Sequence, residues 1–96
     1  MAVTILPGMA PLADRYNGAI LDLWGVIHDG VRRFPGAIEC LGRLRTSGWR
    51  LILLSNAPRR AAPVVEQVAG FGIPPDAYDG LVTSGDLTRA ALLDPD

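Results

Sequence analysis

The sequence contains no lysine, so all nine of its basic residues are arginine. It also has only one histidine, His28, and one cysteine, Cys40, in 96 residues. A single cysteine excludes an internal disulfide and a cysteine-based zinc cluster, and a single histidine excludes a metal site built from several histidines. A lone thiol is typical of a reducing compartment, so we expect a cytoplasmic protein.

Long apolar runs and blocks of one charge are missing as well. No run approaches the roughly 18 apolar residues of a membrane-spanning helix, and the start of the chain lacks the basic and apolar regions of a signal peptide. The net charge is −1, and the arginines form no stripe suited to a nucleic acid. We therefore expect neither a membrane nor a nucleic acid as partner. Apolar residues make up 49% of the chain, enough for the packed core of one small domain.

The remaining pattern alternates between short apolar runs and helical periodicity. The runs at 19–24, 50–54 and 81–82 predict strands, and apolar residues at helical spacing predict helices over 37–46, about 60–69 and 84–93. Thr83 and Asp86 resemble a capping box that opens the last helix. Residues 1–17 are expected to be an irregular leader with one helical turn near 12–16. This order predicts an α/β fold, a partial Rossmann-like parallel sheet with crossover helices.

Three single side chains carry expectations of their own. Cys40 lies beside Leu41 in the helix predicted over 37–46, so we expect it in the core or half-buried. Trp49 precedes the second strand and is expected to cap the core. His28 lies in a predicted loop and is expected to be solvated or hydrogen-bonded.

One carboxylate interrupts the first apolar run. Asp22 lies between Leu21 and Leu23, and taking an ionised carboxylate out of water is costly unless it is paired, hydrogen-bonded or bound to a metal. Ser55 and Asn56 directly follow the second run. Because ligands of open parallel sheets bind beyond the carboxyl ends of the strands, we expect Asp22 and Ser55 to meet there. A carboxylate nucleophile beside anion-holding donors indicates phosphoryl transfer, whereas the plainer interpretation is a turn former and a helix cap.

Four segments together resemble a known family. AILDLWGVIHDG, residues 19–30, resembles the first motif of the haloacid dehalogenase-like hydrolase superfamily, and LLSNAPRR, residues 53–60, resembles its second. FPGAIECLGRLRTSGWR, residues 34–50, and LVTSGDLTRAAL, residues 81–92, are similar to the linking helix and the segment before the cap in subclass IIA. This subclass has a large α/β cap and includes nitrophenylphosphatase-like and sugar-phosphate phosphatases.

The resemblance implies a role for each matching residue. Asp22 would attack phosphorus and form an aspartyl-phosphate, and Asp22 together with the backbone carbonyl of Trp24 would hold Mg²⁺. Ser55 would donate a hydrogen bond to the transferring phosphoryl group. Asn56 and Arg59 would position a phosphorylated small-molecule substrate. The Trp24 ring either packs in the core or lines the pocket and stacks on the substrate.

The chain departs from the family pattern at one position. Phosphatases of the superfamily usually have a second Asp two residues after the nucleophile, where it serves as general acid, and here that residue is Trp24. His28 or Asp29 is a hypothetical replacement. This departure keeps a second function open, namely a catalytically impaired α/β module that binds a phosphorylated ligand or a partner protein.

The third and fourth motifs of the superfamily lie downstream of the cap, whereas this chain ends at Asp96. We therefore expect residues 18–96 to be the N-terminal part of the core domain, inactive alone and with weak or no binding of Mg²⁺. A sheet of three strands would leave an unpaired edge and uncovered apolar surface, so we also expect self-association through that edge.

Overall fold

The computed structural model describes residues 8, 10–12 and 14–94. Its centre is a parallel three-stranded sheet in the order β1-β2-β3. The strands are β1 (Gly18–Asp22), β2 (Arg50–Ser55) and β3 (Gly80–Thr83). The helices are α1 (Ala37–Thr46), α2 (Ala61–Gly70) and α3 (Ser84–Leu93), with short 3₁₀ helices at Ala10–Leu12 and Pro75–Ala77. The predicted α/β fold with a parallel sheet and crossover helices is confirmed.

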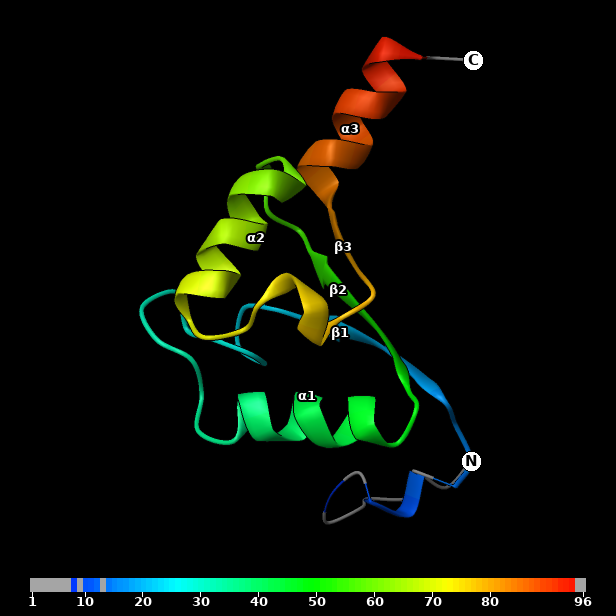
Figure 1. Cartoon of the computed structure of the whole chain (residues 1–96). Helices are drawn as coiled ribbons and strands as arrows, with labels where there is room; N and C mark the ends of the chain where they lie inside the picture. Colours follow the sequence, from blue (N-terminus) through cyan, green and yellow to red (C-terminus); the bar gives the residue numbers. More distant parts are fainter. Residues whose placement is uncertain (1–7, 9, 13, 95–96) are drawn as a thin grey trace, which may run out of the picture.

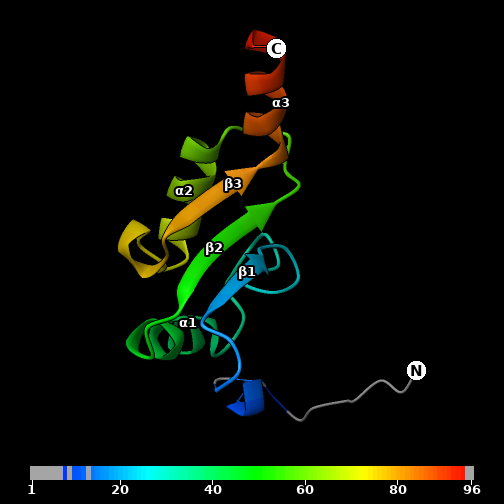
Figure 2. The same ribbon diagram turned by 90° about the vertical axis from the view of Figure 1, so that its right-hand side faces the viewer.

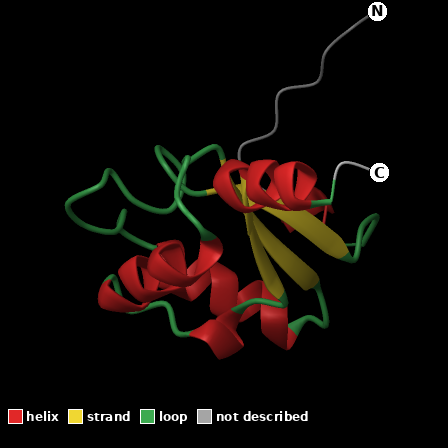
Figure 3. Ribbon diagram, turned by 90° about the horizontal axis from the view of Figure 1, so that it is seen from above, coloured by secondary structure: helices red, strands yellow, loops and turns green. Residues whose placement is uncertain are grey.

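Helices α1 and α2 cover one face of the sheet, while α3 continues beyond the carboxyl ends of the strands (Figure 1). The opposite face of the sheet is turned toward the viewer in Figure 2, with α1 and α2 behind it. Figure 3 shows the same arrangement from above, with helices to one side of the three strands. We call the face turned away from α1 and α2 the open face.

The alternation of side chains along the strands explains this layering. In β2, Leu51 and Leu53 are fully buried against the helices, whereas Leu54 is 44% exposed on the open face. In β1, Leu21 packs against the core while Ile20 is 71% exposed. Such alternation is typical of a sheet with one covered face, because successive side chains of a strand point to opposite sides. The core consists of Leu23, Ile27, Leu41, Trp49, Leu51, Leu53, Val64, Val68, Ile73 and Tyr78.

The first strand ends two residues earlier than predicted. The Asp22 carboxylate accepts a hydrogen bond from its neighbour Leu23 N–H at 2.8 Å, and the Leu23 carbonyl accepts from Val26 and Ile27 N–H. These bonds turn the chain out of the sheet, and Gly25 supplies the positive φ of +80° that the turn requires. Asp22 is therefore the last residue of β1, and the second strand runs one residue further than predicted, to Ser55.

Outside the sheet, some predictions for single side chains and for the leader are confirmed and others are wrong. Trp49 is buried as expected, but Cys40 is exposed because it lies about 100° around α1 from the buried Leu41. The helical turn expected near 12–16 is a 3₁₀ helix at Ala10–Leu12 followed by a turn. Residues 1–7, 9 and 13 of the leader lie outside the described residues. None of the helices described is long and apolar enough to cross a membrane.

A carboxylate ties α1 to the amino end of the sheet. Asp79 accepts hydrogen bonds from Arg45 Nη1 of α1 and from Leu51 N–H of β2, both at 2.7 Å. The Arg45 hydrogen bond, helped by the Leu51 N–H, holds the pKa of Asp79 below its ordinary value. This link lies at the end of the sheet opposite to the site described next.

Candidate active site at the carboxyl ends of the strands

The register of the sheet gathers polar residues at one edge. Asp22 of β1 is paired with Leu54 of β2, so Ser55 follows one position beyond, and Ser55 is itself paired with Thr83 of β3. Each strand therefore ends in a polar side chain at the edge where α/β proteins bind ligands.

A cavity of about 450 Å³ opens at this edge. Three of the residues predicted for the site, Asp22, Ser55 and Asn56, line it together. Its other lining residues are Ile20 and Leu54 from the open face and Ser84 and Leu87 from α3.

Asp22 is exposed to solvent at the end of β1. Its Oδ1 accepts the Leu23 N–H, and no hydrogen bond from the described residues reaches its Oδ2. The hydrogen bond from Leu23 N–H to Oδ1 holds the carboxylate against the backbone. Oδ2 remains available to an incoming ligand.

Ser55 is 3% exposed, and its hydroxyl is oriented by the backbone that follows it. Ala57 N–H donates to Ser55 Oγ at 3.1 Å. A hydroxyl has one proton to donate as well as lone pairs, so this contact uses a lone pair and leaves the proton for another acceptor. Asn56 lies between these two residues and is exposed.

The Trp24 side chain is not among those that line this cavity. Its ring is 55% exposed and meets the His28 ring edge-on, with 5.2 Å between ring centroids. The ring therefore lies outside the buried core, and its stacking on a substrate stays a prediction. The Trp24 carbonyl accepts no hydrogen bond from the described part of the chain.

The His28 side chain is buried in the loop that follows β1. It is 1% exposed, stacks on Phe71 at 4.6 Å, and accepts the Gly30 N–H on Nδ1 at 2.9 Å. The expectation of a hydrogen-bonded histidine is confirmed, but that of a solvated one is wrong because the Phe71 and Trp24 rings enclose it.

The electrostatics of the loop argue against His28 and Asp29 as proton donors. Burial lowers the pKa of His28, and the nearby Asp29 carboxylate opposes this shift. Backbone hydrogen bonds from Arg32 and Val31 lower the pKa of Asp29. At neutral pH the imidazole is therefore uncharged and the carboxyl ionised, and neither residue lines the cavity.

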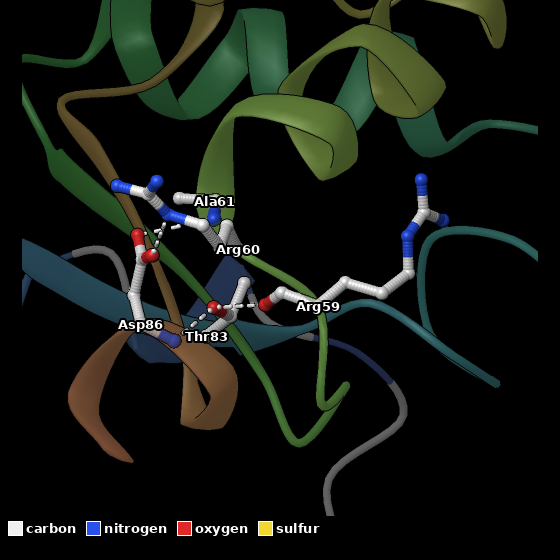
Figure 4. A network of polar contacts seen from close by, with 5 residues as sticks. All are labelled: Arg59, Arg60, Ala61, Thr83 and Asp86. Atoms are coloured by element: carbon white, nitrogen blue, oxygen red, sulfur yellow. Dashed lines mark hydrogen bonds and ion pairs between the residues drawn. The ribbon is translucent and has the colours of Figure 1, made fainter. Parts of the chain in front are cut away.

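Arg59 is likewise not among the residues that line this cavity. Its Nη1 donates to Gln67 Oε1 of α2 at 3.2 Å, and its side chain extends away from Thr83 and Asp86 (Figure 4). Only the backbone carbonyl of Arg59 reaches the start of α3, where it accepts the Thr83 hydroxyl.

A sequence match shows the family of this chain. A family model described as haloacid dehalogenase-like hydrolase matches residues 19–95. The chain belongs to the haloacid dehalogenase-like hydrolases. This finding, together with the similar proteins reported next, confirms the predicted superfamily and its subclass IIA.

Two similar proteins and one solved structure support the assignment to the haloacid dehalogenase-like hydrolases. Chronophin from Bos taurus is 33% identical over 89 residues, which covers 88% of this chain and 30% of that protein. Chronophin from Homo sapiens is 43% identical over 49 residues, 51% of this chain and 17% of that protein. The crystal structure of a haloacid dehalogenase-like hydrolase from Brucella suis 1330 matches with a TM-score of 0.81 at 44% identity, covering 94% of this chain and 35% of that one. The chain thus spans about a third of the length of the bovine protein and of the solved structure.

Haloacid dehalogenase-like hydrolases generally use Mg²⁺. Mg²⁺ prefers about six oxygen ligands in near-octahedral geometry. The carboxylate of Asp22 and the carbonyl of Trp24, which accepts no hydrogen bond from the described residues, are oxygen donors of the right kind. Among the described residues, however, no three His, Cys, Asp or Glu side chains come together as a metal site. These residues therefore fit part of a magnesium site and do not complete it.

Sequence analysis did not predict that Ser84 and Leu87 line the cavity. The segment around Thr83 predicts a helix start, but a strand of four residues does not reveal its pairing with β2. Only that pairing brings the first turn of α3 beside Asn56.

Proposed function

We propose that this protein hydrolyses a phosphorylated small molecule through an aspartyl-phosphate on Asp22. One observation carries the proposal, namely that a carboxylate, a hydroxyl and an amide line a single cavity at the carboxyl edge of the sheet, in a chain of this hydrolase family. Asp22 is the proposed nucleophile. Ser55 is proposed to donate a hydrogen bond to the phosphoryl group, and Asn56 to contact the substrate. We keep Arg59 and Trp24 as proposed substrate contacts only for a ligand that extends past the cavity.

The chemistry takes two displacements at phosphorus. The open oxygen of Asp22 attacks phosphorus, and the bond to the leaving oxygen breaks with its electron pair remaining on that oxygen, which takes a proton from solvent. Water then attacks the phosphorus of the aspartyl-phosphate and releases a proton to solvent, the bond to the Asp22 oxygen breaks with its electron pair remaining on that oxygen, and phosphate leaves. During both displacements the Ser55 hydroxyl donates a hydrogen bond to a phosphoryl oxygen, where negative charge is concentrated, and keeps its proton.

A bound Mg²⁺ would neutralise charge on the phosphoryl oxygens, and Asp22 with the Trp24 carbonyl would hold it. The remaining ligands would come from outside the described residues. We accordingly propose that residues 18–96 act as the N-terminal part of a larger core domain, as the coverage of the relatives supports. A cytoplasmic location is proposed on the basis of the single free thiol at Cys40.

Beryllofluoride, a mimic of the phosphoryl group, tests the proposal directly. The intact protein, which would include the rest of the core domain proposed above, is expected to give a bound ¹⁹F NMR signal with Mg²⁺ and beryllofluoride. Asp22→Asn should abolish that signal, and Ser55→Ala should weaken binding about tenfold because one hydrogen bond to a charged group is lost. Asp29→Asn is the matched control, since the Asp29 carboxylate is engaged by Val31 and Arg32 N–H within its own loop. Unchanged binding by Asp22→Asn would contradict the proposal.

Turnover separates the hydrolase from the alternative function. Trp24 in the usual place of the general acid favours a catalytically impaired module that binds a phosphorylated ligand or a partner protein. p-Nitrophenyl phosphate is the suitable substrate because its leaving group departs without a proton. Release of nitrophenolate that depends on Asp22 supports the hydrolase. Binding of the mimic at Asp22 with no release supports the module.

A further inference from the structure

The loop that follows Ser55 is held by the first turn of α3. The Thr83 hydroxyl donates to the Arg59 carbonyl at 2.6 Å. The Ala57 carbonyl accepts from the Ser84 hydroxyl at 3.0 Å and from Gly85 N–H at 3.1 Å. We call residues 83–86 the α3 clamp, because they donate hydrogen bonds to two backbone carbonyls of the 56–60 loop, those of Ala57 and Arg59.

Asp86 extends the clamp to the start of α2. Its Oδ2 accepts Ala61 N–H at 3.0 Å, and its Oδ1 pairs with Arg60 Nε at 3.3 Å (Figure 4). The N-cap residue of α2, Arg60, makes no capping hydrogen bond with its own side chain. The cap of α2 therefore comes from a residue 25 positions later in the chain.

The predicted capping box is only half formed for this reason. Thr83 Oγ1 accepts Asp86 N–H at 3.1 Å as predicted. The Asp86 carboxylate does not return to Thr83 but caps α2 instead.

The packing at the clamp leaves no room for a larger residue. A β-carbon on Gly85 would collide with the backbone carbonyls of Pro58 and Arg59. Thr83 itself is fully buried. The clamp and the loop are therefore in direct backbone contact.

Ala57 connects the clamp to the proposed site. Its carbonyl is held by the clamp, while its N–H donates to Ser55 Oγ. A loop released from the clamp would allow the Ala57 N–H to move, and the Ser55 hydroxyl would lose the contact that orients it.

We propose that Thr83 and Asp86 are positioning residues that orient Ser55 through the 56–60 loop. The inference rests on the function proposed above for Asp22 and Ser55. Neither residue lines the cavity, and each acts through the backbone of the loop.

The first measurement is the binding of beryllofluoride, with Mg²⁺, to the intact protein that includes the rest of the proposed core domain. Thr83→Val and Asp86→Ala should each raise the dissociation constant about tenfold, because the disoriented Ser55 hydroxyl would lose its hydrogen bond to the mimic. Thr83→Ser and Asp86→Asn keep an acceptor and, for serine, a hydroxyl donor, so both should restore most of the affinity. Asp79→Ala is the matched control, because it removes a carboxylate that likewise accepts one arginine and one backbone N–H, at the opposite end of the sheet. It should lower the melting temperature and leave binding unchanged.

Amide hydrogen exchange by NMR, without the mimic, is the second measurement. Asp86→Ala should accelerate exchange at Ala61, which it caps, and also at Ala57, which it does not touch. If the wild-type protein bound no mimic, the proposed function would fail while exchange at Ala57 still decided the role of the clamp. Faster exchange at Ala61 alone would overturn the inference and leave Asp86 as a helix cap. Weaker binding by Asp79→Ala, equal to that of Asp86→Ala, would also overturn it, because the effect would then reflect stability only.

Discussion

At the scale of single residues, the loop after β1 depends on one glycine. Gly30 has a φ of +91°, and the Trp24 ring occupies the position that a β-carbon on Gly30 would take. The N–H of the same glycine donates to His28 Nδ1. Gly30 therefore lets Trp24 and His28 pack together, and through them it shapes the chain that leaves Asp22.

Replacing Gly30 with alanine should lower the unfolding free energy more than replacing Gly25. Gly25→Ala meets only backbone strain at φ +80° and open space, so we expect a loss of about 1–2 kcal/mol in unfolding free energy. Gly30→Ala adds the collision with Trp24, and overpacking typically costs about 1–3 kcal/mol more. Urea denaturation of both variants measures the difference. Equal losses would show that the Trp24 ring moves away freely.

At the scale of elements, hydrogen bonds between distant segments fix the helices. Asp79 joins α1 to β2, and Asp86 joins α3 to α2. Helix α3 otherwise has no buried residue, so its first turn is its main attachment to the rest of the chain.

Two glycines in helices should respond in opposite directions to the same change. A β-carbon on Gly42 of α1 meets nothing within 4 Å, and alanine is the better helix former, so Gly42→Ala should stabilise the protein by about 0.5–1 kcal/mol. Gly85→Ala should lower the melting temperature because the clamp cannot accommodate the methyl group. Thermal unfolding followed by circular dichroism tests both, and a stabilised Gly85→Ala would contradict the described contact.

The link through Asp79 predicts a dependence on acid. The hydrogen bond from Arg45 lowers the pKa of Asp79, so the folded state binds this proton more weakly than the unfolded state. The stabilisation is therefore complete above the ordinary value of 3.8 and is lost as the pH falls through the lower value of the folded state. Asp79→Asn should reduce stability at pH 7 and make the loss of stability below about pH 4 less steep. An unchanged acid limb of the stability curve would refute this assignment.

Hydrophobic periodicity and the positions of glycine and proline were enough to predict the helices and strands. They were not enough to predict the contacts between these elements. Helix α1 has the predicted bounds because Gly36 and Gly48 flank a run with helical spacing. That Asp22 and Ser55 lie at neighbouring strand ends follows from the parallel topology. The capping of α2 by Asp86 and the packing of Trp24 on His28 depend on three-dimensional register, which no local pattern contains.

At the scale of the whole molecule, the open face leaves apolar side chains in contact with water. Ile20 is 71% exposed, Leu54 44% and Leu87 59%. These three residues also line one cavity, so they form contiguous surface rather than scattered positions. Contiguous exposed apolar surface favours association, and β1 adds an edge strand with unpaired backbone groups.

We therefore predict that the 96-residue chain self-associates through the β1 edge at micromolar concentration. Ile20→Lys should shift the sedimentation distribution toward the monomer, because a charge on an edge strand opposes pairing. Val31→Lys is the matched control, since Val31 is 78% exposed in the loop after β1 and outside the sheet. A monodisperse wild-type monomer that melts cooperatively would contradict the prediction.

The cap that Asp86 provides for α2 also sets an order of events during synthesis. Residue 61 leaves the ribosome well before residue 86. The first turn of α2 therefore lacks its capping hydrogen bond until Asp86 has emerged. Only then does the backbone beside Ser55 take its final shape. The proposed catalytic serine is thus among the last groups in this chain to become organised, although it is encoded near its middle.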